Sequence, residues 1–166
     1  MNIIETDRLI LRKLSTDYAG FMLDLLNQPS FIQFIGDRGV RTLEDAKNYI
    51  LKGPLSSYER FGFGLYLTLL KDGEASIGIC GLVKREALED VDIGFAFLPQ
   101  YWLKGYAFES ASAVLAHARD TLGLKRIVGI ATPDNQGSIC VLEKIGLRFE
   151  KMVKLSGEDI ALKLFA

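Results

Sequence analysis

The sequence predicts an α/β fold, or α+β by stricter naming, in which helices flank a mixed sheet. Between residues 63 and 98, short apolar runs follow one another as the strands of an antiparallel meander would. Beyond residue 105 the pattern changes, because a helix-like stretch precedes a short β-like run and then another helix-like stretch. Strands that meander in one part and alternate with helices in another are typical of a mixed sheet covered by helices.

The first third of the chain should form an edge strand and two helices. Aliphatic and basic side chains nearly alternate from Arg8 to Leu14, which suits a strand with one solvated face at a sheet edge. Apolar residues spaced by three and four from Tyr18 to Leu26 predict a helix that ends before Pro29, where a loop to residue 41 begins. Thr42 and Asp45 resemble a shifted capping box, so a second helix should begin there.

The middle of the chain should contribute three consecutive strands. Phe63 to Leu70 and Ala75 to Val83 are rich in aliphatic and aromatic residues, and a short polar turn containing Gly73 separates them. They are therefore interpreted as a hairpin. Val91 to Leu98 makes the next strand, which Pro99 ends.

The last third should alternate helices and strands. Apolar residues fall on one helical face between Gly105 and Gly123, which predicts the longest helix. Arg126 to Ala131 is a short apolar strand, and Gln136 to Ile145 is a helix that a glycine ends. Phe149 to Val153 and Asp159 to Phe165 should close the fold as a hairpin.

Length and charge limit the possible functions. The 166 residues suit one domain, so residues 1–166 should act as a single unit. Twenty Lys and Arg against twenty-one Asp and Glu leave no field that would recruit nucleic acid or an anionic membrane. Cys80 and Cys140 match neither a metal pattern nor a disulfide framework, so both are expected to be buried thiols. The start lacks a secretory pattern and no run of roughly eighteen apolar residues occurs, so we expect a cytoplasmic protein.

The stretch from Asp92 to Glu109 is the most informative part of the sequence, because a strand there passes through a loop into a helix. Gly105 would let the backbone approach a ligand, and the free N–H groups of a helix start attract anions. Lys104 adds a mobile positive charge. These features suit a phosphate group, although a lone glycine can also serve only a tight connection. No Walker or Gly-x-Gly-x-x-Gly pattern supports a kinase or a dinucleotide-binding enzyme.

Three segments together resemble the GNAT superfamily of acetyltransferases. Asp92 to Glu109 looks like its acetyl-coenzyme A signature. Glu5 to Arg12 resembles the opening strand of the branch that includes the RimJ and RimL ribosomal-protein N-terminal acetyltransferases. Asn135 to Leu147 is similar to the late helix of that branch. The matches occur in the expected order along the chain, so we expect a member of the RimJ/RimL-like branch.

The resemblance implies a largely antiparallel sheet of six to seven strands flanked by about four helices. Its two central parallel strands, here 91–98 and 126–131, would splay apart to admit the pantetheine arm of acetyl-CoA, and the first would carry a bulge. Backbone groups near Phe95, Phe97 and Leu98 would pair with pantetheine like an added strand. An N–H group there would stabilise the oxyanion that forms on attack.

The resemblance also assigns the pyrophosphate of acetyl-CoA to the loop that follows the first of these strands. The residues concerned are Leu103, Lys104, Gly105, Tyr106, Ala107 and Phe108. Leu103 stands where this branch usually has a further glycine, and Trp102 stands where the wider superfamily has Gln or Arg. A leucine still presents its N–H if its φ is negative, so we expect weakened or reshaped cofactor binding rather than its loss.

Catalysis requires that the attacking amine lose a proton. The resemblance favours Asp92 as the base, and a polar strand-end residue is an equally good interpretation. Glu109 in a first helical turn is favoured by the helix dipole alone. Many superfamily members have a proton-donating tyrosine where this chain has Leu142, and in the Rim-type branch the suggested substitute maps onto Ser138, whose hydroxyl can equally serve the backbone. Asn135 can cap the same helix and contact the pantetheine amide.

The sequence therefore predicts an N-acetyltransferase that moves an acetyl group from acetyl-CoA to a primary amine by direct attack in a ternary complex. The amine would belong to a protein N-terminus or a small molecule, and the loop from Phe31 to Arg41 would help to select it. A non-catalytic acyl-CoA-binding module is the alternative. His117 has no partner at metal-ligand spacing, so no metal is expected. The protein should be a monomer or a homodimer.

Overall fold

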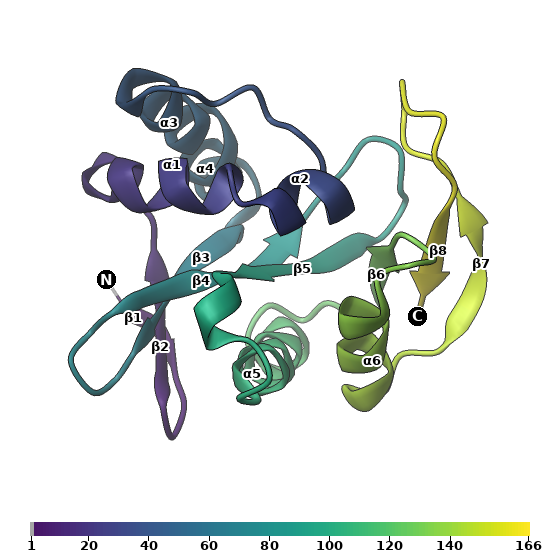
Figure 1. Cartoon of the computed structure of the whole chain (residues 1–166). Helices are drawn as coiled ribbons and strands as arrows, with labels where there is room; N and C mark the ends of the chain where they lie inside the picture. Colours follow the sequence, from purple (N-terminus) through teal and green to yellow (C-terminus); the bar gives the residue numbers. More distant parts are fainter. Residues whose placement is uncertain (1) are drawn as a thin grey trace.

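A computed structural model describes residues 2–166, which form one open sheet with helices on both faces (Figure 1). The eight strands lie in the order β1-β2-β3-β4-β5-β6-β8-β7. Neighbouring strands are antiparallel except for the parallel pair β5 and β6. The strands are β1 Asn2–Glu5, β2 Leu9–Lys13, β3 Leu65–Leu70, β4 Ser76–Val83, β5 Val91–Phe97, β6 Ile127–Ala131, β7 Phe149–Val153 and β8 Leu162–Phe165. The predicted mixed α/β fold is confirmed.

The helices divide between the two faces of the sheet (Figure 1). The first three helices pack on one face and the last two on the other, while the short fourth helix contributes its buried Tyr58 to the core beneath the fifth. The α-helices are α1 Ala19–Leu26, α2 Pro29–Phe34, α3 Leu43–Ile50, α4 Ser56–Phe61, α5 Tyr106–Asp120 and α6 Gln136–Lys144. Short helical turns occupy Thr16–Tyr18, Leu51–Leu55 and Pro99–Tyr101.

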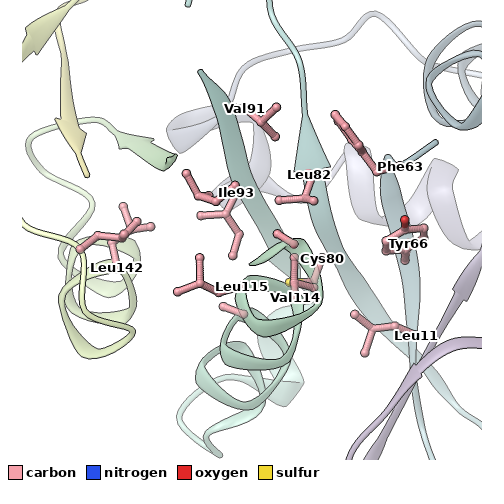
Figure 2. Packing of buried hydrophobic residues seen from close by; sticks show 14 of the residues in the cluster. Leu11, Phe63, Tyr66, Cys80, Leu82, Val91, Ile93, Val114, Leu115 and Leu142 are labelled. Atoms are coloured by element: carbon pink, nitrogen blue, oxygen red, sulfur yellow. The ribbon is translucent and has the colours of Figure 1, made fainter. Parts of the chain in front are cut away.

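Each face of the sheet has its own apolar core. Figure 2 shows the core under α5, where Val114 and Leu115 pack against Cys80 and Ile93 of the central strands. The other core joins α1 and α3 to the opposite face of β2, β3 and β4. Burial of a large aliphatic side chain stabilises the folded state by about 1.5–3 kcal/mol, so these two layers fix the sheet between them.

Local signals account for several of these elements. Thr42 Oγ1 accepts a hydrogen bond from the Asp45 N–H at 3.0 Å, and Asp45 Oδ2 accepts one from the Thr42 N–H at 3.2 Å. The predicted capping box is therefore confirmed at the start of α3. No helix among residues 2–166 has both the length and the apolar character needed to cross a bilayer.

Three details of the first third differ from expectation. Residues 2–5 form β1, a strand that the sequence pattern did not predict, and it pairs with the outer side of β2. β2 therefore lies inside the sheet, and its prediction as an edge strand was wrong. Pro29 starts α2 instead of a loop, because the first helical position needs no N–H donor and favours the φ of proline. The sequence pattern also did not predict α4, which follows α3 through the turn at Leu51–Leu55.

The two parallel strands separate, as predicted. The paired registers of β5 and β6 are Val91 with Ile127 and Asp92 with Val128, and beyond them β6 pairs with β8 over residues 129–131. The expected bulge in β5 is absent, because its register with β4 is unbroken from Asp92 to Phe97. The fork therefore opens where β6 stops pairing with β5 and begins to pair with β8.

Candidate active site

Two cavities meet at the fork between β5 and β6. The larger cavity, of about 700 Å³, lies among α2, the loop after β5 and the first turns of α6. The smaller cavity, of about 500 Å³, lies among the loop after α2, the first half of β5 and the β7–β8 loop. The residues that line both are Phe31, Phe34, Ile35, Phe95, Ala96, Asn135 and Ser138. Two reactants entering from different sides would therefore meet beside these residues.

The backbone of β5 turns alternately toward β4 and toward the fork. The Leu98 N–H donates to the Ile77 carbonyl on β4 at 3.0 Å. Because alternate residues of an antiparallel ladder face the same neighbour, Phe95 and Phe97 turn their backbone groups the other way, toward the fork. Leu98 was predicted with them as a pantetheine-binding position, and its N–H is already bonded to Ile77, so any contact of Leu98 with pantetheine would have to use another group. Phe95 and Phe97 keep the predicted position.

Trp102 connects the loop after β5 to that strand. Its indole Nε1 donates to the Phe97 carbonyl at 2.8 Å, although the side chain is partly exposed. The Phe97 carbonyl therefore already accepts a hydrogen bond. The Phe97 N–H takes no part in that bond. The tryptophan therefore fixes the distance between the strand and the loop, a role that sequence reasoning did not find.

The loop adopts two left-handed residues, Leu103 with φ +59° and Gly105 with φ +85°. The negative φ under which a leucine would present its N–H in the ordinary way is therefore not adopted at Leu103. The leucine occupies a conformation that costs a non-glycine residue about 1–2 kcal/mol, which explains why glycine suits this position. Its side chain is fully exposed, so packing does not offset the strain.

The start of α5 is built to receive an anion. Gly105 is the N-cap, and the first helical hydrogen bond runs from the Glu109 N–H to the Gly105 carbonyl at 3.0 Å. The N–H groups of Tyr106, Ala107 and Phe108 precede that bond and have no acceptor within the helix. Lys104 is exposed beside them. All the predicted loop residues therefore surround one helix N-terminus of a fifteen-residue helix.

Arg8 holds this loop against the turn between β1 and β2. Its Nη1 donates to the Lys104 carbonyl at 3.0 Å, and its Nε donates to Glu109 Oε1 at 2.7 Å. The guanidinium lies 4.4 Å from the centre of the Tyr106 ring. A side chain at Gly105 would bring its Cβ to 3.2 Å from Arg8 Nη2. Sequence reasoning missed this contact, whose only signal was the resemblance of the segment around Arg8.

Glu109 is the partner of Arg8 in this contact, which we call the clamp, and it holds the start of α5 against the β1–β2 turn. Its Oε2 accepts from the Arg8 N–H at 3.0 Å and from the Thr6 hydroxyl. Burial tends to raise the pKa of Glu109, but the hydrogen bonds from Thr6 and Arg8 prevail and lower it. The carboxylate is thus kept ionised and engaged, which agrees with the structural interpretation.

Asn135 and Ser138 form a closed pair at the start of α6. Asn135 Oδ1 accepts from the Ser138 N–H at 3.2 Å, and Asn135 Nδ2 donates to Ser138 Oγ at 3.0 Å. Asn135 therefore caps the helix, and the amide orientation is fixed by the backbone N–H. Because Ser138 Oγ accepts from the amide, its own proton remains available to another group.

Leu142 and Cys140 follow Ser138 on α6 but differ in placement. Leu142 is buried and lies against Gly129, where a Cβ would come within 2.4 Å of its Cδ2. Cys140 is exposed and lines the larger cavity, so the expectation of two buried thiols holds only for Cys80. The buried face of α6 carries Ile139 and Leu142, and Cys140 lies outside that face.

Asp92 lines the smaller cavity at the base of the fork and is 1% exposed. Its Oδ2 accepts from Arg85 Nε at 2.8 Å, while its Oδ1 has no hydrogen-bond partner among residues 2–166. Burial raises the pKa of Asp92, although Arg85 opposes that rise. Sequence reasoning did not predict the Arg85 partner. The structure thus brings Asp92 and Ser138 to one cavity.

No group of three metal-ligating side chains occurs in the part of the chain that the structure describes. The site consequently consists of backbone donors, one serine, one buried carboxylate and the start of a long helix.

Comparisons with known proteins agree with this geometry. The family model of the acetyltransferase (GNAT) domain matches residues 8–148. The uncharacterized N-acetyltransferase YnaD of Bacillus subtilis (strain 168) is 31% identical over 151 residues, which cover 91% of this chain and 85% of YnaD. A GNAT-family acetyltransferase structure from Bacillus anthracis has a TM-score of 0.80 and 26% identity, covering 98% of this chain and 95% of that one.

The same fold occurs in a structure titled RimL, the ribosomal L7/L12 alpha-N-protein acetyltransferase, in complex with coenzyme A. Its TM-score is 0.85 at 18% identity, over 99% of this chain and 96% of that chain. At this identity the likeness concerns the fold. With the family model matching most of the sequence, this chain belongs to the GNAT family of acetyltransferases, which take their acetyl group from acetyl-CoA.

Proposed function

We propose that this protein transfers the acetyl group of acetyl-CoA to a primary amine by direct attack within a ternary complex. The observation that carries the proposal is the meeting of the two cavities at Phe95, Ala96, Asn135 and Ser138. One cavity ends at a helix start suited to a phosphate, and the other contains a buried carboxylate. A donor and an acceptor can therefore occupy the molecule together, so no covalent acetyl-enzyme is needed.

The larger cavity suits acetyl-CoA. The free N–H groups before Glu109 and the left-handed backbone at Leu103 and Gly105 form a cradle for its pyrophosphate, which a side chain at Gly105 would narrow. Phe95 presents its N–H and carbonyl to the fork and Phe97 its N–H, which an added strand could use. Acetyl-CoA supplies the activated acetyl thioester. The protein supplies the alignment of that thioester along β5.

Backbone donors facing the fork would stabilise the negative charge that develops on the thioester oxygen. The N–H groups of Phe95 and Phe97 belong to a rigid central strand, so they need no reorganisation during the reaction. Loss of one such donor typically reduces turnover by about 100- to 1,000-fold. The strand is therefore proposed as the electrostatic part of the site.

Ser138 and Asp92 are proposed to move protons. Ser138 passes its hydroxyl proton to the departing thiolate sulfur as the C–S bond breaks, and water in the cavity that Ser138 lines returns a proton to its Oγ; the hydroxyl proton is free for this because the oxygen accepts from Asn135. Asp92 receives a proton from the acceptor side through Oδ1, which has no partner within the described chain. Its raised pKa makes it a better base than an ordinary aspartate.

Binding and turnover test the proposal separately. Calorimetric titration with acetyl-CoA should show binding, free CoA should also bind, and ATP should not. Release of the CoA thiol should then depend on an added amine. Acetyl-CoA binding without release across a broad panel of amines would instead favour the non-catalytic acyl-CoA-binding module, and absence of binding would refute the assignment of the larger cavity.

A further inference from the structure

The smaller cavity carries opposite charges on opposite sides. Arg38, in the loop after α2, and Arg85, in the loop after β4, line it together with the half-buried Tyr49 of α3. Glu158 and Asp159, in the β7–β8 loop, line it as well. Figure 1 shows these loops approaching one another over the same end of the sheet. The cavity is thus suited to a molecule that carries both signs of charge.

The two arginines on the cationic side of the cavity are placed to contact a ligand. Arg85 is only 30% exposed and faces into the cavity, where its Nε already donates to Asp92. Arg38 is exposed and forms no ion pair within residues 2–166, so its guanidinium is free for a ligand. Both guanidinium groups act on the Tyr49 hydroxyl and oppose the rise in its pKa that burial causes. The Tyr49 hydroxyl therefore lies in the positive potential of Arg38 and Arg85.

Buried polar atoms without partners point to a ligand in the same place. Three buried side-chain oxygens lack a hydrogen-bond partner in the described chain: Thr68 Oγ1, Asp92 Oδ1 and Thr132 Oγ1. Asp92 and Thr132 both line the smaller cavity. A buried oxygen without a hydrogen-bond partner destabilises the folded protein. A bound molecule that donates a hydrogen bond to this oxygen removes the penalty, which favours binding.

We infer that the acceptor amine also carries a carboxylate, which Arg38, Arg85 and Tyr49 bind while the amine points to the fork. This inference rests on the proposed function and specifies its substrate class, an amino acid or the acidic N-terminal residue of a peptide. Arginine presents planar paired donors that match a carboxylate. Phosphate, as a dianion, fits less well, because the cavity already holds three acidic side chains against two arginines.

The charged β7–β8 loop would help to draw such a substrate into the cavity before its amine reaches the fork. Glu158 and Asp159 are exposed at the cavity wall and would attract an incoming ammonium group. A polyamine would meet the same attraction, but its second cationic group would have to lie against Arg38 or Arg85. Like charges at close range oppose that arrangement. An acceptor with one amine and one carboxylate avoids this repulsion and is therefore favoured over a polyamine.

Matched acceptors test the inference. CoA release would be measured with an amino acid, its carboxamide and its decarboxylated amine, and with peptides whose first residue is Glu or Gln. The free carboxylate should raise kcat/KM by roughly 10- to 100-fold over the carboxamide or Gln counterpart. A preference among free amino acids assigns a small molecule, and a preference among peptides assigns a protein N-terminus; either supports the inference.

Equal rates for acid and amide, or faster acetylation of a diamine, would overturn the inference while leaving the acetyltransferase assignment intact. No acetyl transfer to any acceptor, despite acetyl-CoA binding, would overturn the proposed function together with the inference. These two failures are distinguishable, because the first still shows amine-dependent CoA release.

Variants locate the effect on the cavity wall. Arg38→Gln should raise KM for the carboxylate substrate by about 10-fold and reduce the preference for the carboxylate over the carboxamide. Arg119→Gln, on an exposed site of α5 away from both cavities, is the matched control and should change neither. Arg85→Lys keeps the charge beside Asp92 but loses the paired donors, so it should reduce the same preference. Unaltered preference in a folded Arg38→Gln protein that binds acetyl-CoA would contradict the assignment.

Discussion

Arg8 Nη1 donates a hydrogen bond to the Lys104 carbonyl at 3.0 Å, which joins the first turn of the chain to the loop before α5. The two residues are 96 positions apart. The same guanidinium pairs with Glu109 on the first turn of the helix. The shape of the proposed pyrophosphate loop therefore depends on the β1–β2 turn as well as on its own sequence.

Arg8→Gln should weaken acetyl-CoA binding by about 10-fold, because the loop loses its tie and the site loses a positive charge. Titration calorimetry would measure the dissociation constant at two salt concentrations. Arg12→Gln removes an arginine paired with the exposed Glu74 and should leave binding unchanged. Equal affinities of Arg8→Gln and the unaltered protein would show that the clamp is irrelevant to the loop.

Leu103→Gly should stabilise the folded protein by about 0.5–1 kcal/mol, because relief of left-handed strain exceeds the extra freedom of glycine in the unfolded chain. Acetyl-CoA affinity should be equal or higher. Urea denaturation gives the free energy of unfolding, and Leu103→Ala, which retains the strain and removes only exposed atoms, should change it little. Destabilisation by the glycine would argue against the strained backbone.

Gly105→Glu should reduce acetyl-CoA affinity far more than Gly105→Gln does. Both substitutions put a side chain on a left-handed residue and near Arg8, so they share the steric cost. Only the glutamate adds a negative charge where phosphate is expected. Calorimetry on both folded variants would measure the difference in acetyl-CoA affinity. Identical affinities would contradict the assignment of the phosphate to this helix start.

Ser138→Ala should lower kcat by about 100-fold with little change in acetyl-CoA affinity, because the variant lacks the proposed proton donor. The Ser138 backbone N–H still bonds to Asn135 Oδ1, so the helix cap should persist. Ser138→Thr keeps a hydroxyl and should retain more activity. Steady-state kinetics would decide, and an unchanged kcat in the alanine variant would assign the proton to water.

Features that depend on nearby residues were predictable. Thr42 and Asp45 bond to each other three positions apart, so the sequence alone indicates their capping box. Gly105 was placed correctly at a helix start for the same reason. Pro29 was misjudged because proline both ends and begins helices, and only the packing of α2 distinguishes the two cases.

Features that depend on distant residues were not predictable. Arg8 reaches Lys104 only because the sheet places the first turn beside α5. Arg85 meets Asp92 across the β4–β5 connection, and the positive φ of Leu103 was not predictable from the residue type, because a leucine ordinarily avoids that conformation. The fork was predicted by resemblance, but the unbroken β4–β5 register was not, because pairing of strands is a property of the whole sheet.

Asp92→Asn should abolish the proposed base and change how stability depends on pH. Burial raises the pKa of Asp92 above its ordinary value of 3.8, so the folded protein binds a proton where the unfolded chain has lost it. The stability contributed by Asp92 is therefore fully present below pH 3.8 and falls as pH rises through its raised pKa. Asparagine cannot titrate, so the free energy of unfolding of the unaltered protein, relative to the variant, should decrease over that window. Denaturation at a series of pH values would measure this difference, and kcat should fall by about 100-fold at neutral pH. A difference that increases with pH would mean that Arg85 outweighs burial and lowers the pKa of Asp92, which would make it a weaker base than an ordinary aspartate.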